Sequence, residues 1–304
     1  SLFNLIFKRE LKITNFINNP HLLLTFSSLF WGFNAIAGRL AIDEISPMLI
    51  VSGRWLGVMI ILSFICRYEL LEGYRLFKKH YLWMILMGIS GFTVFNSIYY
   101  IAAHYTIAIN LGIIQSIMPA FIIIISMIWL KTKISLIQVI GLLTTFIGVA
   151  IIVSKGNLKG LIFLEFNKGD LLLIFACLFY SIYAVGLKKR PKINDILLMM
   201  IFSYIAFLSS LPGLILEIGN NSLILPSNKG ILILFVIIIF PSFLAQIFFM
   251  KGVKLIGPST SGLYTNLVPV FTAFLAVIII DEEFHFYHLL SLVIIFLGIF
   301  IFEK

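Results

Sequence analysis

The sequence predicts an all-α integral membrane protein of ten transmembrane helices, arranged as two inverted five-helix repeats around a central cavity, with both termini cytoplasmic. Three observations predict this fold: the composition, the placement of basic residues and an internal repeat. Hydrophobic residues make up 61% of the 304 residues, charged residues only 12%, and the mean hydropathy is +1.10. A soluble domain carries about 25% charged residues. This chain therefore has too little polar surface for a water-facing globule, and the bilayer is its natural solvent.

Ten apolar runs are long enough to be membrane spans, because a helix needs about 20 residues to cross the hydrocarbon core. They cover roughly 22–42, 47–66, 81–103, 107–130, 135–154, 169–187, 195–217, 230–250, 258–280 and 286–302. Residues 1–20 mix polar and apolar side chains, so we expect a cytoplasmic or interfacial segment rather than a removable signal peptide. A first repeat over 21–154, an outer linker over 155–168 and a second repeat over 169–304 complete the predicted organisation.

The basic residues indicate the orientation, because cytoplasmic loops of membrane proteins carry the excess of Lys and Arg. With a cytoplasmic amino terminus, sixteen basic residues fall on the inside. The outside loops then hold only Arg39, Lys155, Lys159, Lys168 and Lys229. Membrane orientation accounts for the formal net charge of +9, and we expect no nucleic-acid partner.

The two halves of the chain match at a nearly constant offset. An offset of 150 residues pairs Gly112 with Gly262, Pro119 with Pro269, Gly148 with Gly298 and Asn96 with Gln246. Five spans are an odd number, so the second copy enters the membrane from the opposite side. The charges agree, because Lys131–Lys133 ends the fourth span inside, whereas the equivalent Asp281–Glu283 ends the ninth span outside. Inverted repeats of this kind allow one site near the midplane to be reached from either face.

Several short pieces, in this order and spacing, resemble the EamA-type branch of the drug/metabolite transporter superfamily over about 22–303. They are Trp31–Asn34, Arg54, Pro119, Gln138, Gly141, Gly148, Gly169–Leu172, Pro269 and Glu283. The resemblance implies a five-plus-five inverted repeat with a central cavity. It also implies export or exchange of amino acids, nucleotide-related compounds or other small metabolites. One departure is the basic Lys131–Lys133, which stands where the family commonly has an acidic residue at the end of the fourth helix.

Arg54 is the only charge deep in a span, about eight residues from its start, or ~12 Å at 1.5 Å per residue. An intramembrane charge must face the protein interior or a wet cavity. One hypothesis makes it a counter-charge for a carboxylate or phosphate of the substrate. The other makes it a structural arginine, paired with Asp43, Glu44 or helix carbonyls.

Further polar and aromatic side chains recur at matching depths in both halves. They favour a cavity lining, although helix-to-helix contacts worth about 0.6 kcal/mol each are the alternative for any one of them. The predicted substrate-binding residues are Trp31, Asn34, Arg54, Asn96, Tyr99, Tyr100, Gln115, Tyr180, Tyr183, Gln246, Tyr264, Thr265 and Asn266.

Pro119 and Pro269 interrupt the fourth and ninth spans at equivalent points. Each proline lacks an N–H and so frees the carbonyl four residues earlier, which belongs to Gln115 and Thr265 respectively. Free carbonyls at membrane depth occur where the backbone is buried in protein or lines a cavity. We expect these breaks to act in gating, and a simple structural kink is a compatible alternative.

The sequence contains no nucleotide-binding G-x-x-x-x-G-K-[ST], no H-E-x-x-H and no G-x-S-x-G, so we expect no enzyme, cofactor or metal. His285 and His288 are interpreted as part of an interfacial turn rather than a metal site. Asp43, Asp170 and Glu217 all lie near span ends, so proton coupling through a midplane acid lacks a candidate.

These features predict a secondary transporter in a bacterial-type inner membrane, an exporter or exchanger of amino acids or similar small metabolites. Its expected partners are the lipid bilayer and a small-molecule substrate, and the sequence does not decide its oligomeric state. Two alternatives stay open: an intramembrane enzyme acting on a lipid-linked substrate, and a non-transporting assembly partner of another membrane protein.

Overall fold

A computed structural model describes residues 18–105, 114–154, 156–157, 168–279, 283 and 285–304. Over these ranges the chain forms helices and turns, without a β-strand. Several sequence predictions fall outside the described residues. They concern the segment 1–17, the beginning of the fourth span at 107–113 with Gly112, most of the linker 155–168, and the acidic pair 281–282.

The first half contains α2 (Pro20–Leu40), α3 (Pro47–Ile65), α4 (Leu70–Gly88), the π-helical η1 (Ile89–Val94), α5 (Phe95–Ala102), α7 (Met118–Trp129) and α8 (Leu136–Val153). The second half contains α9 (Lys168–Gly186), the 3-10 turn η3 (Leu187–Lys189), α10 (Asp195–Gly219), α11 (Asn228–Ile237), the π-helical η4 (Ile238–Leu244) and α12 (Ala245–Ile256). It ends with α13 (Pro258–Leu263), the 3-10 helix η5 (Tyr264–Leu267), α14 (Val268–Ile279) and α15 (Phe286–Phe302).

Six of these continuous helical stretches are long and apolar enough to cross a membrane: Pro47–Ile65, Leu70–Ala102, Lys168–Lys189, Asp195–Gly219, Asn228–Ile256 and Pro258–Ile279. Three shorter apolar helices accompany them, at Met118–Trp129, Leu136–Ile151 and Phe286–Phe302. Helix α2 has 21 residues but is not among the six. The count of ten spans therefore stays a prediction. The six long apolar stretches are those of a multi-pass membrane protein.

The third helical stretch differs from its predicted bounds, because it begins at Leu70 and not near residue 81. The backbone at His80 is non-helical, with φ −126° and ψ 24°, so a kink separates the early turns from the apolar run. Those early turns carry Glu72, Arg75, Lys78 and Lys79. A search for apolar runs misses them, because an amphipathic surface helix is not continuously hydrophobic.

The repeat seen in the sequence recurs in the helices. Helices α7 and α14 begin at Met118 and Val268, and helices α8 and α15 begin at Leu136 and Phe286, so each pair is 150 residues apart. The two π-helical segments, η1 and η4, also lie at equivalent positions. Both halves therefore share their irregular segments as well as their regular ones.

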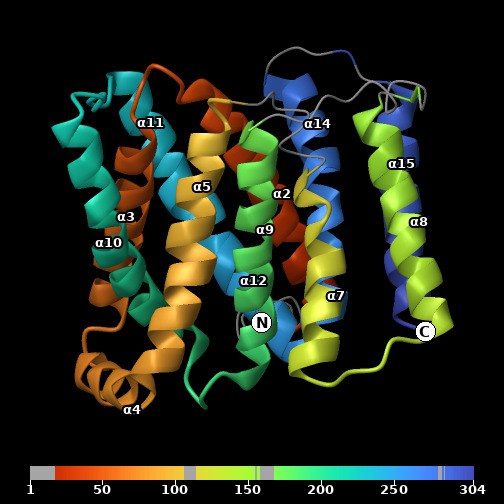
Figure 1. The fold of residues 1–304 in the computed structure, drawn as a ribbon, viewed down its shortest axis with the longest axis horizontal. Coiled ribbons are helices and arrows are strands. Elements are labelled where there is room, and N and C mark those ends of the chain that lie inside the picture. The colour runs from red at the N-terminus through yellow and green to blue at the C-terminus, as the bar shows by residue number, and fades with distance from the viewer. Residues whose placement is uncertain (1–17, 106–113, 155, 158–167, 280–282, 284) are drawn as a thin grey trace, which may run out of the picture.

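Equivalent helices run antiparallel to each other. Glu217, near the end of α10, accepts hydrogen bonds at 2.8 Å from the Ser46 hydroxyl and the Met48 amide at the start of α3. In the α8–α15 pair, a Cβ built on Gly141 lies 2.8 Å from the carbonyl oxygen of Gly298. Figure 1 shows these two antiparallel pairs at opposite ends of the bundle.

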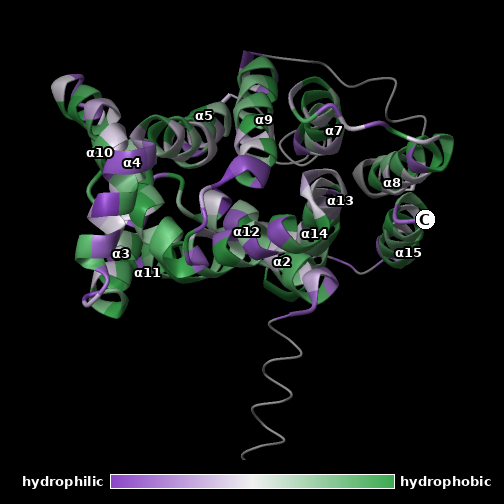
Figure 2. Ribbon diagram, turned by 90° about the horizontal axis from the view of Figure 1, so that it is seen from below, coloured by the Kyte–Doolittle hydropathy of each residue, from purple (hydrophilic) through white to green (hydrophobic). Residues whose placement is uncertain are grey.

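The first helices of the two halves exchange partners. Helix α9 packs on α5 and α7 of the first half, and α2 packs on α12 and α14 of the second half. In the view along the helix axes, these helices lie in the middle of the molecule, between the α3–α10 pair and the α8–α15 pair (Figure 2). The described chain ends also meet, since Nδ1 of His21 lies 3.4 Å from Oε1 of Glu303.

The outer surface is rich in large apolar side chains, whereas the largely apolar interior also contains a set of buried polar side chains. Large hydrophobic side chains such as Phe64, Ile128 and Ile278 are 70–75% exposed. Arg54, Asn96 and many serines are buried in the interior. Lipid is the solvent that suits such a surface, because the apolar side chains lose nothing in facing hydrocarbon.

Candidate functional site

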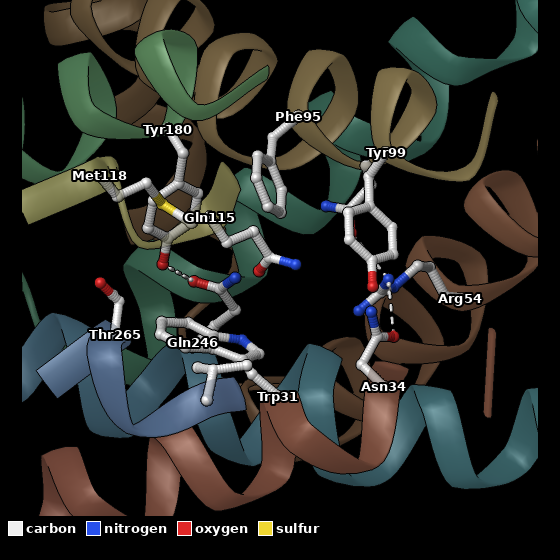
Figure 3. Close-up of a pocket in the computed structure, with 12 residues that line it drawn as sticks. Trp31, Asn34, Arg54, Phe95, Tyr99, Gln115, Met118, Tyr180, Gln246 and Thr265 are labelled. Carbon is white, nitrogen blue, oxygen red and sulfur yellow. Dashed lines mark hydrogen bonds between the residues drawn. The ribbon is translucent and has the colours of Figure 1, made fainter. Parts of the chain in front are cut away.

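A cavity lies among the exchanged helices and contains about 460 Å³ of space that no atom fills, open solvent included. Figure 3 shows the side chains that point into it. Its lining consists of Trp31, Asn34, Arg54, Phe95, Asn96, Tyr99, Gln115, Met118, Tyr180, Gln246, Thr265 and Val268. Eight of these residues come from the first half and four from the second, so neither half forms the cavity alone.

The lining follows the repeat. At the repeat offset of 149 or 150 residues, four lining residues of the first half are equivalent to the four of the second. The equivalent pairs are Trp31 with Tyr180, Asn96 with Gln246, Gln115 with Thr265, and Met118 with Val268. The cavity is therefore formed by the same structural positions of both halves, where their antiparallel copies meet.

Arg54 breaks this symmetry, since its repeat partner Ser203 is fully buried outside the cavity and donates to a backbone carbonyl of its own helix. The Arg54 residue is 2% exposed. Its Nε donates to the Ser242 hydroxyl at 2.7 Å, and its Nη1 donates to Oδ1 of Asn96 at 2.7 Å. Ser242 belongs to the π-helical η4, and Asn96 lies directly after η1. The π-helical segments thus place both acceptors.

Two further acceptors surround the guanidinium. Nη1 lies 3.2 Å from the Tyr100 hydroxyl and 3.5 Å from Oδ1 of Asn34, and Tyr100 also donates to Asn34 at 2.8 Å. The Trp55 ring contacts the guanidinium, with 5.1 Å from Cζ to the ring centroid. These partners are neutral, so the charge is solvated by dipoles and rings but is not balanced by an acid.

The alternative in which Arg54 pairs with Asp43 or Glu44 is wrong. Glu44 instead accepts a hydrogen bond from Ser227 and forms an ion pair with Lys229, Oε1 to Nζ 3.3 Å. Arg54 and Asp43 form no ion pair, and both are among the described residues. The reason is distance along the chain: Arg54 lies two turns inside α3, while the acids lie in the loop before it.

The opposite side of the cavity is aromatic. The Tyr180 hydroxyl donates to Oε1 of Gln246 at 3.3 Å. The Trp31 ring meets Tyr180 edge-on at 5.7 Å between centroids, and Phe95 lies 5.0 Å from Tyr180. A solute here would therefore meet the cation at one end and rings with a single amide–hydroxyl pair at the other (Figure 3).

Nine of the thirteen predicted binding residues line the cavity, and four do not. Tyr100 lies behind Asn34 in the arginine network. Tyr183 packs between Phe92 and Phe202, and its buried hydroxyl has no hydrogen-bond partner among the described residues.

The other two lie on the ninth span. The Tyr264 hydroxyl contacts Nδ1 of His21 at 2.7 Å, and Asn266 donates to the Thr145 hydroxyl at 2.9 Å. Neither side chain lines the cavity. Phe95, Met118 and Val268 were missed by the sequence prediction. They are apolar residues in an apolar chain, and only their repeat positions could have indicated them.

The two prolines lie at the expected breaks, in the first turn of the helix that follows each break. Pro119 is the second residue of α7 and Pro269 the second of α14. The residues before them form a turn in the first half and the 3-10 helix η5 in the second. The prediction that the Thr265 carbonyl is free is wrong, because the Val268 amide donates a hydrogen bond to it. The 3-10 helix thus replaces the hydrogen bond that Pro269 cannot make.

His285 and His288 form the predicted turn. Nδ1 of His288 accepts from the His285 amide at 3.0 Å and so caps the first turn of α15. Within the described part of the chain, no three His, Cys, Asp or Glu side chains gather closely enough to hold a metal ion.

Comparison with known proteins also shows two matching halves and relates the chain to transporters. The profile of the EamA-like transporter family matches residues 19–154 and, a second time, residues 167–303. The uncharacterized transporter YyaM of Bacillus subtilis is 23% identical over 285 residues, which cover 92% of both chains. An uncharacterized transporter of Archaeoglobus fulgidus is 22% identical over 295 residues, covering 93% of this chain and 97% of its own. A crystal structure superposes with a TM-score of 0.74 at 16% identity, over 93% of this chain and 95% of its own, and shows the same fold.

Proposed function

The chain belongs to the EamA-like transporter family, and from that premise we propose that it is a secondary transporter of amino acids or similar small metabolites, working as an exporter or exchanger. The family and the names of the relatives indicate a transporter rather than an enzyme. The proposed mechanism is alternating access between two inverted five-helix repeats, at 21–154 and 169–304. Ten spans, cytoplasmic termini and a bacterial-type inner membrane belong to the same proposal.

The observation that supports alternating access is that repeat-equivalent residues of both halves line the same cavity. The pairs Asn96 with Gln246 and Gln115 with Thr265 line one cavity from antiparallel halves. If the halves exchange conformations, the cavity opens to the opposite face while its lining stays the same. The helix breaks before Pro119 and Pro269 adjoin this lining and are the segments proposed to bend.

The enzyme alternative has little support. An intramembrane hydrolase would need a nucleophile, a base or a metal at the cavity, and no histidine lies among the lining residues. His21 contacts Tyr264 and Glu303 at the chain ends, and His288 caps α15. A non-transporting assembly partner would have no use for a cavity lined from both repeats.

Reconstitution into proteoliposomes tests the proposal. Uptake and efflux of radiolabelled amino acids and small organic acids are measured against empty vesicles. A matched pair of variants serves as control: Gln246→Leu removes a lining amide, and Phe300→Leu changes an exposed side chain on the lipid-facing surface. We expect saturable, protein-dependent movement of at least one solute that Gln246→Leu impairs and Phe300→Leu retains. If no solute in a broad panel moves faster than in empty vesicles, the proposal fails.

A further inference from the structure

We infer that the cavity selects a solute that carries a carboxylate without a compensating ammonium group, and that the Nη2 amino group of Arg54 binds this carboxylate. The inference rests on the proposed function and changes its substrate class: of the amino acids and similar metabolites proposed there, it keeps the small organic anions and excludes the amino acids. Four observations on the cavity carry it: the donors of Arg54, the charge of the lining, the acceptors already in use and the aromatic end.

The donors of Arg54 are only partly used. A guanidinium has five N–H donors and no acceptor. Its single Nε donor is taken by Ser242, and its two Nη1 donors face three acceptors, of which Asn96 is nearest at 2.7 Å. Nη2 donates to none of the described residues. The Arg54 side chain lines the cavity, so a ligand in the cavity can supply the two missing acceptors.

The charge of the lining is unbalanced. Arg54 is the one charged residue among those that line the cavity, and none of them is acidic. The five ion pairs among described residues all lie elsewhere and leave Arg54 out. A buried charge without a counter-ion is costly, and a hydrogen-bonded anion relieves that cost. An Arg–carboxylate contact also joins a planar donor group to a planar acceptor group.

An ammonium group would find no carboxylate among the lining residues, only neutral amide oxygens, hydroxyls and ring faces. The Asn34 and Asn96 oxygens already accept from Arg54 and Tyr100, and Oε1 of Gln246 already accepts from Tyr180. Gln115 and the Thr265 hydroxyl are neutral, and Thr265 donates to a backbone carbonyl. An α-amino acid would therefore bring its ammonium close to Arg54 with no carboxylate of the lining to neutralise it, and the two like charges would repel.

The remainder of the solute is expected to be neutral and apolar. Away from Arg54, the cavity offers the rings of Trp31, Phe95 and Tyr180. A carboxylate placed at Nη2 leaves its hydrocarbon or aromatic part against these rings (Figure 3). The chemical class is thus a monocarboxylate with an apolar body.

Binding to the purified full chain separates this class from its neighbours. Two trios of ligands share a skeleton: 3-phenylpropanoate, its primary amide and phenylalanine, and 4-methylpentanoate, its primary amide and leucine. We expect the carboxylate of a trio to bind at least tenfold more tightly than its amide and its amino acid, by calorimetry. Equal or tighter binding of the amide or the amino acid overturns the inference, and so does a failure of both carboxylates to bind.

Variants of Arg54 supply an independent readout. Arg54→Met removes the charge, Arg54→Lys keeps it without the planar fork, and Ser203→Ala changes the repeat-equivalent position outside the cavity. We expect Arg54→Met to lose the carboxylate preference and Ser203→Ala to retain it. Arg54→Lys should lie between them. If Arg54→Met folds and keeps the wild-type preference, the inference is wrong. Transport of the two carboxylates by that variant at the wild-type rate would also overturn it while leaving the transporter proposal standing. A wild-type protein that moves no solute would contradict the transporter proposal instead.

Discussion

Replacing Asn96 with aspartate changes one atom of the cavity and adds a carboxylate where Arg54 already donates. The distance from Nη1 to Oδ1 of Asn96 is 2.7 Å, so the new carboxylate lies within ion-pair distance of Arg54. Its second oxygen replaces the Nδ2 that donates to the Phe92 carbonyl at 2.6 Å, so the carboxylate has to turn away from that carbonyl. Two unit charges about 4 Å apart interact by ~4 kcal/mol at an effective dielectric constant of about 20. Because 1.4 kcal/mol is about a factor of ten in affinity, an internal counter-ion of this strength weakens a competing anion by up to roughly a thousandfold.

Asn96→Asp is therefore expected to weaken carboxylate binding and transport about 100-fold or more. Asn96→Leu is the matched control, because it removes the same hydrogen bond without adding charge. It should weaken carboxylate binding less than Asn96→Asp does, since a hydrogen bond to a charged group is worth about 1.5–3 kcal/mol and the added ion pair ~4 kcal/mol. Calorimetry and uptake of the same carboxylate measure both variants. Equal losses in the two variants would refute the electrostatic reasoning.

Three further predictions concern packing, lining and pH. Gly141→Val should lower the free energy of unfolding by about 1–3 kcal/mol, and with it the melting temperature, because a Cβ at Gly141 lies 2.6 Å from the backbone of α15. Gly219→Val, with nothing within 4 Å, should cost far less. Tyr180→Phe should raise the KM of transport, because this hydroxyl lines the cavity, and Tyr183→Phe should leave KM unchanged, because its hydroxyl does not. The pKa of Glu44 is lowered by its hydrogen bond to a serine and by a neighbouring lysine, so its contribution to stability is complete above the ordinary value of 4.5 and is lost as the pH falls through the lower folded value. Glu44→Gln should therefore lower the melting temperature near pH 7 and have no effect once the carboxyl is protonated.

Much of the cavity could be predicted because helical periodicity and a constant repeat offset both survive in the sequence. Asn96 and Gln246 share a depth by the offset alone, and the structure places both in the lining. Periodicity fails where the helix is irregular. In the 3-10 helix η5 each residue turns by about 120° instead of 100°. Thr265 therefore faces the cavity while its neighbours Tyr264 and Asn266 point to His21 and α8.

The hydrogen-bond partners of Arg54 could not be predicted, because they come from three separate helical segments, α2, α5 and η4. The sequence shows that Asn96 and Tyr100 share one helix face, but not that this face meets α3. The π-helical segments were also not foreseen. Pro241, inside η4, is one signal for them, since a proline within a helix often accompanies a local change in hydrogen bonding. The first π-helical segment carries no proline, and its weaker sign is the Ser90–Gly91 pair, since helices also bend at such pairs.

Access to Gln115 from the two membrane faces tests the central claim most directly. The two cysteines, Cys66 and Cys177, are free and buried, and their replacement by serine gives a background for a single Gln115→Cys variant. A membrane-impermeant thiol reagent is then applied to one face at a time in oriented vesicles. We predict labelling from both faces, and slower labelling when a transported solute is present. Labelling from one face only, whatever the solute conditions, would contradict a single cavity that opens alternately to each side.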